Sequence, residues 1–194
     1  MNRWNGYIPP GECSGQGLVN LLINKTGDLF GVEIGCADGD TSEHLLCHLP
    51  NLHWTGVDPY VDYVDWNSNN LVNLQGAYEA LDRKIMKTYP DRTTFLRMTS
   101  DVAATHIPDG SLDFVFIDGL HTYEQVKIDC QNFYPKVKSG GLFAGHDYTI
   151  IDGVHRAVNE FRDSIDPSIT ICVTNYDVWY FQITTSGTHS LPLT

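Results

Sequence analysis

The sequence predicts an α/β fold: a doubly wound, mostly parallel sheet with helices on both faces. Short apolar strands alternate with amphipathic helical stretches along the chain, and this alternation favours parallel pairing. Polar or acidic residues follow the ends of the predicted strands, where open α/β sheets bind their ligands. The last two strands follow each other as a hairpin, and an antiparallel last strand is allowed in such a sheet.

The first half of the chain supplies two strands and three helical stretches. In order, we expect a short apolar helical stripe over 18–23, a strand near 29–34, a helix from Asp40 to Pro50, a strand over 53–57 and a long helix over 70–88. Asp40 is expected to cap its helix, because Glu43 three residues later completes a capping box. Apolar residues three and four positions apart give the long helix a single buried stripe.

The second half supplies three strands, two helices and the closing hairpin. We expect strands over 94–98, 114–117 and 142–144, helices over 123–134 and from Asp152 to about 165, and hairpin strands over 169–173 and 178–183. Pro135 ends the first of these helices, and Ser139-Gly140-Gly141 turns the chain into the next strand. Residues 1–194 form one domain, with an N-terminal helical segment (1–28), a core (29–184) and a loose tail (185–194).

Composition and charge exclude several classes of function. The formal net charge is −12 and the lysines and arginines form no cluster, so nucleic acid is not an expected partner. No stretch approaches the roughly 20 apolar residues of a membrane span, so no membrane partner is expected. The 5 cysteines form no C-x-x-C pair and indicate small core residues in a reducing compartment, for which the cytoplasm is the simplest location.

A glycine turn follows the first strand and indicates a nucleoside-binding crevice. Gly35 and Gly39 let the backbone turn sharply and come close to a ligand. Asp58 lies 19 residues after Gly39, where a doubly wound sheet places the carboxylate that holds ribose hydroxyls. The G-x-x-x-G spacing departs from the dinucleotide fingerprint, and Asp38 and Asp40 would repel a pyrophosphate but tolerate a sulfonium and an ammonium. The turn therefore disfavours a nicotinamide-dependent oxidoreductase.

Two polar stretches follow neighbouring strands of the predicted sheet and indicate a metal site. Asp118 comes directly after the strand over 114–117, and His146 and Asp147 come after the strand over 142–144. Neighbouring parallel strands lie about 4.8 Å apart, so these side chains can converge on one cation. Carboxylate oxygens with one imidazole suit Mg²⁺ or Mn²⁺ and leave positions for water or substrate oxygens.

Together these motifs resemble a known group of enzymes. The pattern E-x-G-x-x-x-G at 33–39 is similar to the first motif of the class I S-adenosylmethionine-dependent methyltransferases. D-G-x-H-x-Y-E at 118–124, G-H-D-Y at 145–148 and the ending Val178-Trp179-Tyr180 resemble the short metal-dependent small-molecule O-methyltransferases, which include macrolide-sugar O-methyltransferases. The resemblance spans roughly residues 30–183 and implies a Rossmann-like sheet of seven strands in the order 3-2-1-4-5-7-6, with the last strand antiparallel.

The resemblance also implies roles for individual residues. Asp118 and Asp147 become metal ligands with His146 as a third candidate, and His121 and Asp118 become the catalytic residues, with His121 as general base. An imidazole suits that role, because its ordinary pKa of about 6.5 lets it accept a hydroxyl proton at neutral pH. The implied contacts of the cofactor are Glu33, Gly35, Cys36, Ala37, Gly39, Thr41, Ser42, Asp58, Pro59, Ser100, Asp101 and Asp118.

Each assignment has a structural alternative. Asp118 can cap the helix that follows it, His121 can bond a loop carbonyl, and His146 can orient a ligating carboxylate instead of binding the metal. Glu33 can brace the glycine turn through backbone N–H groups. Asp101 can simply start the helix that follows the third strand.

The expected function is methyl transfer from S-adenosylmethionine to a hydroxyl of a small molecule, such as a sugar or natural product, with help from Mg²⁺ or Mn²⁺. The alternative is a metal-independent or inactive S-adenosylmethionine-binding protein. Tyr60, Tyr63 and Trp66 either cover the substrate as a lid or pack the helix over 70–88 onto the sheet. Fewer than 35 residues precede the glycine turn, so a second subunit of a homo-oligomer is a candidate source of further pocket residues.

Overall fold

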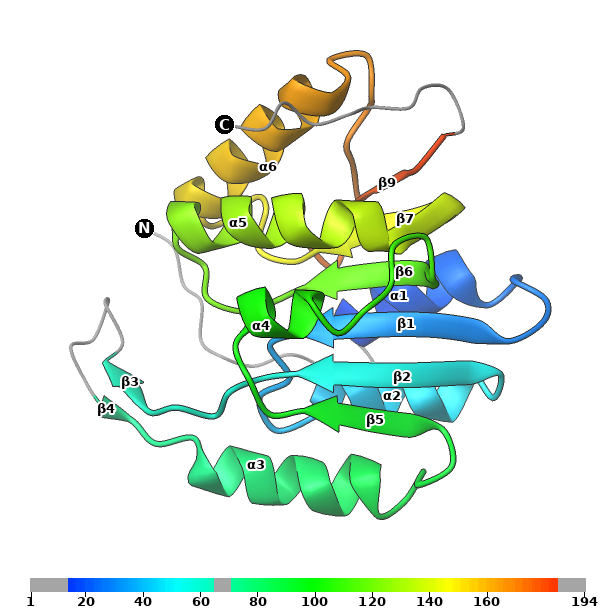
Figure 1. Cartoon of the computed structure of the whole chain (residues 1–194), viewed down its shortest axis with the longest axis vertical. Helices are drawn as coiled ribbons and strands as arrows, with labels where there is room; N and C mark the ends of the chain where they lie inside the picture. The colour runs from blue at the N-terminus through cyan, green and yellow to red at the C-terminus, as the bar shows by residue number, and fades with distance from the viewer. Residues whose placement is uncertain (1–13, 65–70, 185–194) are drawn as a thin grey trace.

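The computed structural model describes residues 14–64 and 71–184 and contains a seven-stranded sheet with helices on both sides (Figure 1). The strands are β1 (Leu29–Ile34), β2 (Leu52–Val57), β5 (Thr93–Leu96), β6 (Leu112–Ile117), β7 (Val137–Gly145), β8 (Cys172–Val173) and β9 (Trp179–Gln182). They lie in the order β5-β2-β1-β6-β7-β9-β8, and only β9 runs against the others. This order confirms the predicted 3-2-1-4-5-7-6 sheet with its antiparallel last strand.

Two groups of helices cover the two faces of the sheet. One face holds α1 (Ser14–Leu22), α2 (Asp40–His48), α3 (Gln75–Leu81) and the π-helix η1 (Asp82–Met86). The other holds α4 (Ser100–Ala104), α5 (Tyr123–Phe133) and α6 (Asp152–Ile165), with the 3-10 turn η2 (Tyr134–Lys136) after α5. None of the helices in the described part of the chain is long and apolar enough to cross a membrane.

The central strand β6 shows why the sheet is buried on both faces. Phe114 and Phe116 join the core under α1 and α2, whereas Val115 and Ile117 join the core under α5 and α6. All four side chains are at most 4% exposed. A continuous apolar run of this kind is typical of a parallel strand that helices cover on both sides.

The helix expected over 70–88 is confirmed over 75–86, as α3 and η1, and is wrong at its beginning. Residues 71–72 form the short strand β4 (Leu71–Val72), which pairs with β3 (Tyr63–Val64) as a small separate hairpin. α3 begins only at Gln75, and η1 follows it without a break. The apolar spacing of the segment is that of a helix, but antiparallel pairing with 63–64 takes its first residues.

Two further expectations about local structure are corrected. Strand β7 runs through the predicted turn at Ser139-Gly140-Gly141. The strand accommodates these residues as an irregularity like a β-bulge: Gly140 has a φ of 77°, and the register against β6 shifts there. Asp40 does not cap α2: the N-cap position is Gly39, with no side-chain cap, and the carboxylate of Asp40 pairs with Lys84 instead. The predicted tail (185–194) and Trp66 lie outside the described residues.

Candidate active site

The ends of β6 and β7 bring the two polar motifs together. These strands are parallel neighbours, with Ile117 opposite Gly145. The backbone N–H of His146 donates to the carbonyl of Ile117 at 3.0 Å, and that of Asp118 donates to the carbonyl of Ile34 at 2.8 Å. The loops after β6 and β7 therefore begin side by side, as the sequence predicts.

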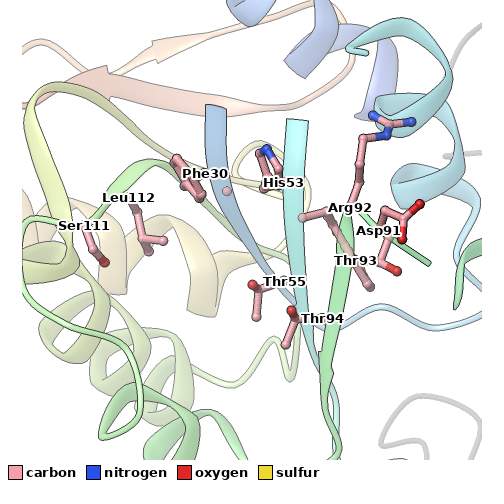
Figure 2. A pocket seen from close by; sticks show the side chains of 11 residues that line it. Phe30, His53, Thr55, Asp91, Arg92, Thr93, Thr94, Ser111 and Leu112 are labelled. Carbon is pink, nitrogen blue, oxygen red and sulfur yellow. The ribbon is translucent and has the colours of Figure 1, made fainter. Parts of the chain in front are cut away.

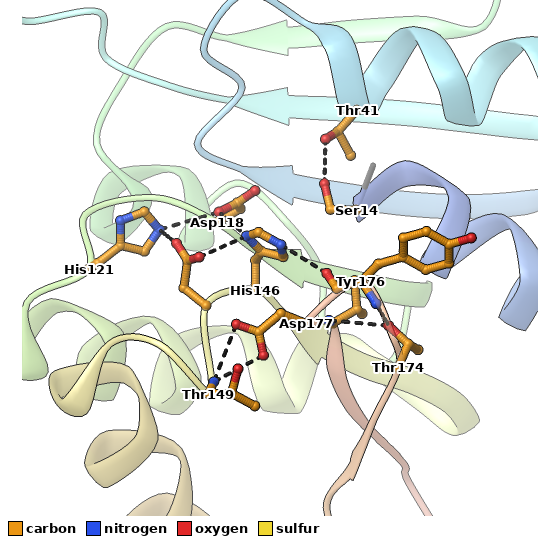
Figure 3. Close-up of polar contacts among 11 residues, drawn as sticks. Ser14, Thr41, Asp118, His121, His146, Thr149, Thr174, Tyr176 and Asp177 are labelled. Atoms are coloured by element: carbon orange, nitrogen blue, oxygen red, sulfur yellow. Dashed lines mark hydrogen bonds and ion pairs between the residues drawn. The ribbon is translucent and has the colours of Figure 1, made fainter. Parts of the chain in front are cut away.

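Asp118, His121, His146 and Asp147 form a compact polar cluster (Figure 3). Nε2 of His121 lies 3.3 Å from Oδ1 of Asp118 and 3.1 Å from Oδ2 of Asp147. Nδ1 of His146 lies 3.2 Å from Oδ1 of Asp147 and 3.7 Å from Oδ1 of Asp118. Both imidazoles thus face both carboxylates.

The turn of the β8–β9 hairpin forms hydrogen bonds with His146 and with the loop that follows β7. The carbonyl of Tyr176 accepts a hydrogen bond from Nε2 of His146 at 3.1 Å, and Asp177 Oδ1 accepts one from the N–H of Thr149 at 3.0 Å (Figure 3). A carbonyl only accepts, so Nε2 of His146 carries hydrogen and Nδ1 is the atom left for the carboxylates or for a cation. Sequence reasoning missed this contact, because Tyr176 is 30 residues away and uses only its backbone.

The carboxylates and imidazoles of the cluster shift one another's pKa values. Burial raises the pKa of Asp118, whereas the neighbouring imidazoles outweigh burial at Asp147 and lower its pKa. Burial alone would lower the pKa of both histidines, but the carboxylates outweigh it, so the pKa of His121 lies above its ordinary value and that of His146 rises to about 9. The carboxylates therefore favour the protonated form of both imidazoles.

The donor set fits a divalent cation. Ligand atoms of Asp118, His121 and Asp147 all lie within 4.8 Å of one another. Carboxylate oxygens with imidazole nitrogen match the preferences of Mg²⁺ and Mn²⁺. Asp147 also has a φ of 60°, a left-handed conformation that costs energy outside glycine and is concentrated at functional sites. The prediction placed His146 in the ligand set, whereas the group of described residues whose ligand atoms meet in this way contains His121 and not His146.

The structural alternatives for Asp118 and His121 do not describe their observed contacts. Thr122, not Asp118, caps α5, since its hydroxyl accepts a hydrogen bond from the N–H of Gln125 at 3.3 Å. Nε2 of His121 faces carboxylates rather than a loop carbonyl.

The glycine turn lies directly against the cluster. Gly35 has a φ of 83°, and a Cβ there would lie 2.2 Å from the carbonyl oxygen of Asp118. Gly35 is therefore required by the approach of the protein's own β6–α5 loop. Gly39 has a φ of 84° and a Cβ there would lie 3.2 Å from Ile85 Cγ1. The cofactor contacts of Gly35 and Gly39 stay predictions.

Asp58 braces the glycine turn from the end of β2. Its Oδ2 accepts hydrogen bonds from the N–H groups of Cys36 at 3.0 Å and Ala37 at 3.4 Å, and its Oδ1 accepts one from Tyr60 at 2.8 Å. Oδ1 keeps a lone pair for a further donor, so the carboxylate fits the predicted hold on ribose hydroxyls. The Tyr60 ring is buried and contacts Tyr78 of α3, which matches the packing alternative for this aromatic residue.

Glu33 lies beneath the turn and is only 1% exposed. Its Oε2 accepts hydrogen bonds from Ser42 Oγ at 2.6 Å and Trp54 Nε1 at 2.8 Å, so it braces the turn through side chains and not through backbone N–H groups. Burial raises the pKa of Glu33 to about 8, which keeps it neutral at physiological pH. Ser42 is fully buried in this contact. Direct contacts of Glu33 and Ser42 with the cofactor stay predictions.

The other predicted cofactor contacts lie around the same edge. Ser100 begins α4, and its hydroxyl donates to the buried carboxylate of Asp129 at 2.5 Å. Asp101 is exposed in the first turn of α4, which agrees with the alternative that it starts this helix. Its carboxylate accepts a hydrogen bond from Asn132 at 3.3 Å. The hydroxyl of Thr41 pairs with that of Ser14 at 2.8 Å (Figure 3). The cofactor contacts of these residues, and of Pro59, stay predictions.

A hollow of about 270 Å³ lies at the opposite end of the sheet (Figure 2). It is lined by the first residues of β1, β2, β5 and β6, and the ring of Phe30 stacks on that of His53 there at 4.9 Å. Neither the cluster nor the glycine turn contributes to its lining. Ligands of open α/β sheets bind at the carboxyl ends of the strands, so the candidate active site is the cluster and not this hollow.

Comparisons with known proteins identify solved structures with the same fold. No curated protein matches the chain. A solved protein from Corynebacterium glutamicum has a TM-score of 0.64 at 19% identity, covering 95% of this chain and 86% of that one. A precorrin 8w decarboxylase from Methanobacterium thermoautotrophicum has a TM-score of 0.62 at 13% identity, covering 94% and 96%. A spermidine synthase from Thermotoga maritima has a TM-score of 0.57 at 15% identity, and the match covers 91% of this chain but 60% of the synthase.

At these identities the solved structures show the fold, and the family follows from the sequence match. A family model described as a methyltransferase domain matches residues 32–148, which is more than half of the chain. That stretch contains the glycine turn, Asp58 and the whole polar cluster. The chain therefore belongs to this methyltransferase domain family and is an S-adenosylmethionine-dependent methyltransferase.

Proposed function

We propose that the protein is an O-methyltransferase that acts on a hydroxyl of a small molecule and uses a divalent cation to bind that hydroxyl. One observation supports this most: the backbone of Asp118 lies against Gly35, where a Cβ would come within 2.2 Å of it. A cation held by Asp118 and Asp147 would therefore adjoin the cofactor turn. Methyl transfer requires this closeness of acceptor oxygen and methyl donor.

The two histidines take different roles in this proposal. The carbonyl of Tyr176 holds Nε2–H of His146, and such an outer hydrogen bond is typical of an imidazole that ligates a metal through its other nitrogen. Asp118, Asp147 and His146 would then hold the cation, and His121 is left to accept the hydroxyl proton. The second arrangement exchanges the two imidazoles, since His121 also lies within ligand distance of both carboxylates.

The cofactor supplies a methyl group on a sulfonium, and a divalent cation lowers the pKa of a coordinated hydroxyl. Asp58 holds the glycine turn in shape through the backbone N–H groups of Cys36 and Ala37. His121 must be neutral to accept the proton, but the two carboxylates raise its pKa and favour its protonated form. In this proposal the divalent cation would offset the negative charge of the carboxylates, so that His121 can be neutral. The products are a methyl ether, S-adenosylhomocysteine and the proton on His121.

Turnover with and without metal tests the proposal. The protein is treated with a chelator, dialysed and assayed for S-adenosylhomocysteine release with a panel of catechols, sugars and other small hydroxyl compounds. We expect activity only after Mg²⁺ or Mn²⁺ is restored, and full turnover of the metal-free protein would refute the role of the cation. Calorimetry gives a parallel check, because S-adenosylhomocysteine should bind and NAD(H) should not.

Single histidine variants separate the two arrangements. His146→Ala should weaken Mn²⁺ binding, measured by electron paramagnetic resonance, by about 10- to 100-fold. His121→Ala should keep Mn²⁺ binding and lose the acidic limb of the pH–rate profile, because a base that must be neutral makes the rate fall as pH falls. The reverse pattern would make His121 the ligand, and unchanged activity in His121→Ala would remove it as the base.

A further inference from the structure

A lysine from a distant helix reaches the glycine turn. Lys84 forms an ion pair with Asp40, and its Nζ lies 3.5 Å from Oδ2 of Asp38. The neighbouring residue of the helix, Ile85, packs against Gly39 between these two aspartates. Lys84 is 44 residues from Asp40 in the sequence, so only the fold brings this charge to the turn.

The helix that carries Lys84 has an unusual form at this point. η1 is a π-helix, and the N–H of Lys87 donates to the carbonyl of Asp82 at 3.0 Å, five residues back. Single π-turns of this kind are frequent at functional sites. Lys84 and Ile85, both in this π-helix, contact the glycine turn: Lys84 pairs with Asp40, and Ile85 packs against Gly39.

Charge balance at the turn depends on this lysine. Asp38 and Asp40 are half to mostly exposed, with side-chain exposures of 50% and 72%, and Lys84 is the cation paired with them in the described part of the chain. The resemblance to the class I methyltransferases implies that the glycine turn holds the amino-acid end of S-adenosylmethionine, which carries an ammonium and a carboxylate. Two unpaired aspartates would attract the first group and repel the second.

On the basis of the proposed function, we propose that Lys84 is a specificity-determining residue for the cofactor. By pairing with Asp38 and Asp40 it lets an acidic turn accept a cofactor that carries a carboxylate. Without Lys84 the turn should favour adenosyl compounds that lack this group. Lys84 acts through the aspartates and does not itself bind the methyl donor.

Three adenosyl ligands test the proposal by calorimetry with Lys84→Met. S-adenosylhomocysteine has the carboxylate, decarboxylated S-adenosylmethionine lacks it, and 5′-methylthioadenosine lacks the whole amino-acid end. We expect S-adenosylhomocysteine to bind about fivefold more weakly at low salt, with the loss shrinking at high salt. The dissociation constant of 5′-methylthioadenosine should stay within about twofold of wild type, and decarboxylated S-adenosylmethionine should bind as tightly or more tightly.

The chain offers matched controls. Lys87→Met removes the same charge next to the same helix, where Lys87 pairs with Asp82 at 2.7 Å, and should leave all three ligands unaffected. Lys84→Arg should restore S-adenosylhomocysteine binding. Adding Asp38→Asn and Asp40→Asn to Lys84→Met should restore it as well, because the repelling charges are then gone.

Other outcomes overturn the proposal. Equal weakening of all three ligands would mean that Lys84 only shapes the turn, and no weakening would mean that the ion pairs have no role in binding. If the triple variant stays as weak as Lys84→Met, repulsion is not the cause. Failure of the metal proposal would appear in the Mn²⁺ titration and would leave the relative affinities of the three adenosyl ligands unchanged.

Discussion

Two sets of carboxylates at the same end of the sheet differ in how the protein handles their charge. Glu33 is 1% exposed, bonded by Ser42 and Trp54, and neutral because burial raises its pKa to about 8. Asp118 and Asp147 keep side-chain exposures of 21% and 13% and face imidazoles. The buried carboxyl group of Glu33 braces the glycine turn, whereas Asp118 and Asp147 are the partly exposed pair that we propose for metal binding. The following changes should separate these two roles.

The largest effect is expected at the partly exposed pair. Asp147→Asn should weaken Mn²⁺ binding by about 100-fold or more, since it removes a charged ligand. Asparagine tolerates the left-handed backbone at this position, so the fold should persist. Electron paramagnetic resonance measures the free Mn²⁺. Asp113→Asn is the matched control, because Asp113 pairs with Lys138 away from the cluster and should leave binding unchanged. An Asp147→Asn variant that binds Mn²⁺ like wild type would remove Asp147 from the site.

The second effect is a pH dependence of stability that belongs to Glu33. Its pKa is raised from 4.5 to about 8 on folding, so the unfolded chain releases this proton at lower pH than the folded protein. Stability therefore falls as pH rises between these two values, by up to about 4 kcal/mol. Glu33→Gln, which resembles the neutral acid, should lack this loss.

Urea unfolding of wild type and Glu33→Gln between pH 5 and pH 9 measures this difference. The exposed Glu79→Gln serves as control and should follow wild type at every pH. Parallel stability curves for wild type and Glu33→Gln would show that Glu33 is ionised in the folded protein, and the contrast with the partly exposed pair would be lost.

A smaller effect is expected at Asp58, which both braces the turn and is predicted to hold the ribose. Asp58→Ala should weaken S-adenosylhomocysteine binding by about 1–3 kcal/mol, the scale for lost hydrogen bonds to a charged group. Calorimetry gives the value, and Mn²⁺ binding should change little. Wild-type affinity in Asp58→Ala would mean that the ribose is held elsewhere.

The smallest effect is expected at Thr122, the cap of α5 beside the cluster. Thr122→Ala should lower the free energy of unfolding by about 1 kcal/mol, because the N–H of Gln125 loses its acceptor. Thr122→Ser keeps the hydroxyl and should be neutral. A large loss of Mn²⁺ affinity in Thr122→Ala would show that the cap also positions His121.

The sheet and the meeting of Asp118 with His146 and Asp147 were predictable, because strand ends follow from apolar runs and parallel neighbours share an edge. The contacts that complete the site were not. Tyr176 acts through its backbone, and Lys84 reaches Asp40 across 44 residues. Sequence patterns locate strand ends, but they give no sign of contacts made by a distant backbone carbonyl or by the side chain of a distant lysine.

The failed predictions share one physical cause, which is that tertiary contacts override local preference. Asp40 satisfies the capping-box pattern, yet the ion pair with Lys84 takes its carboxylate. Residues 71–72 have helical apolar spacing, yet they pair with 63–64. In each case the competing partner lies far away in the sequence.

Anomalous diffraction from crystals grown with Mn²⁺ and S-adenosylhomocysteine would show directly whether metal and cofactor sites adjoin. We predict one manganese peak bonded to the carboxylates of Asp118 and Asp147, with an imidazole nitrogen as a further ligand and the cofactor on the Gly35 side. If S-adenosylhomocysteine is bound while both carboxylates stay paired with His121 and His146 and no manganese peak lies between them at millimolar Mn²⁺, the proposed metal-assisted methyl transfer is wrong.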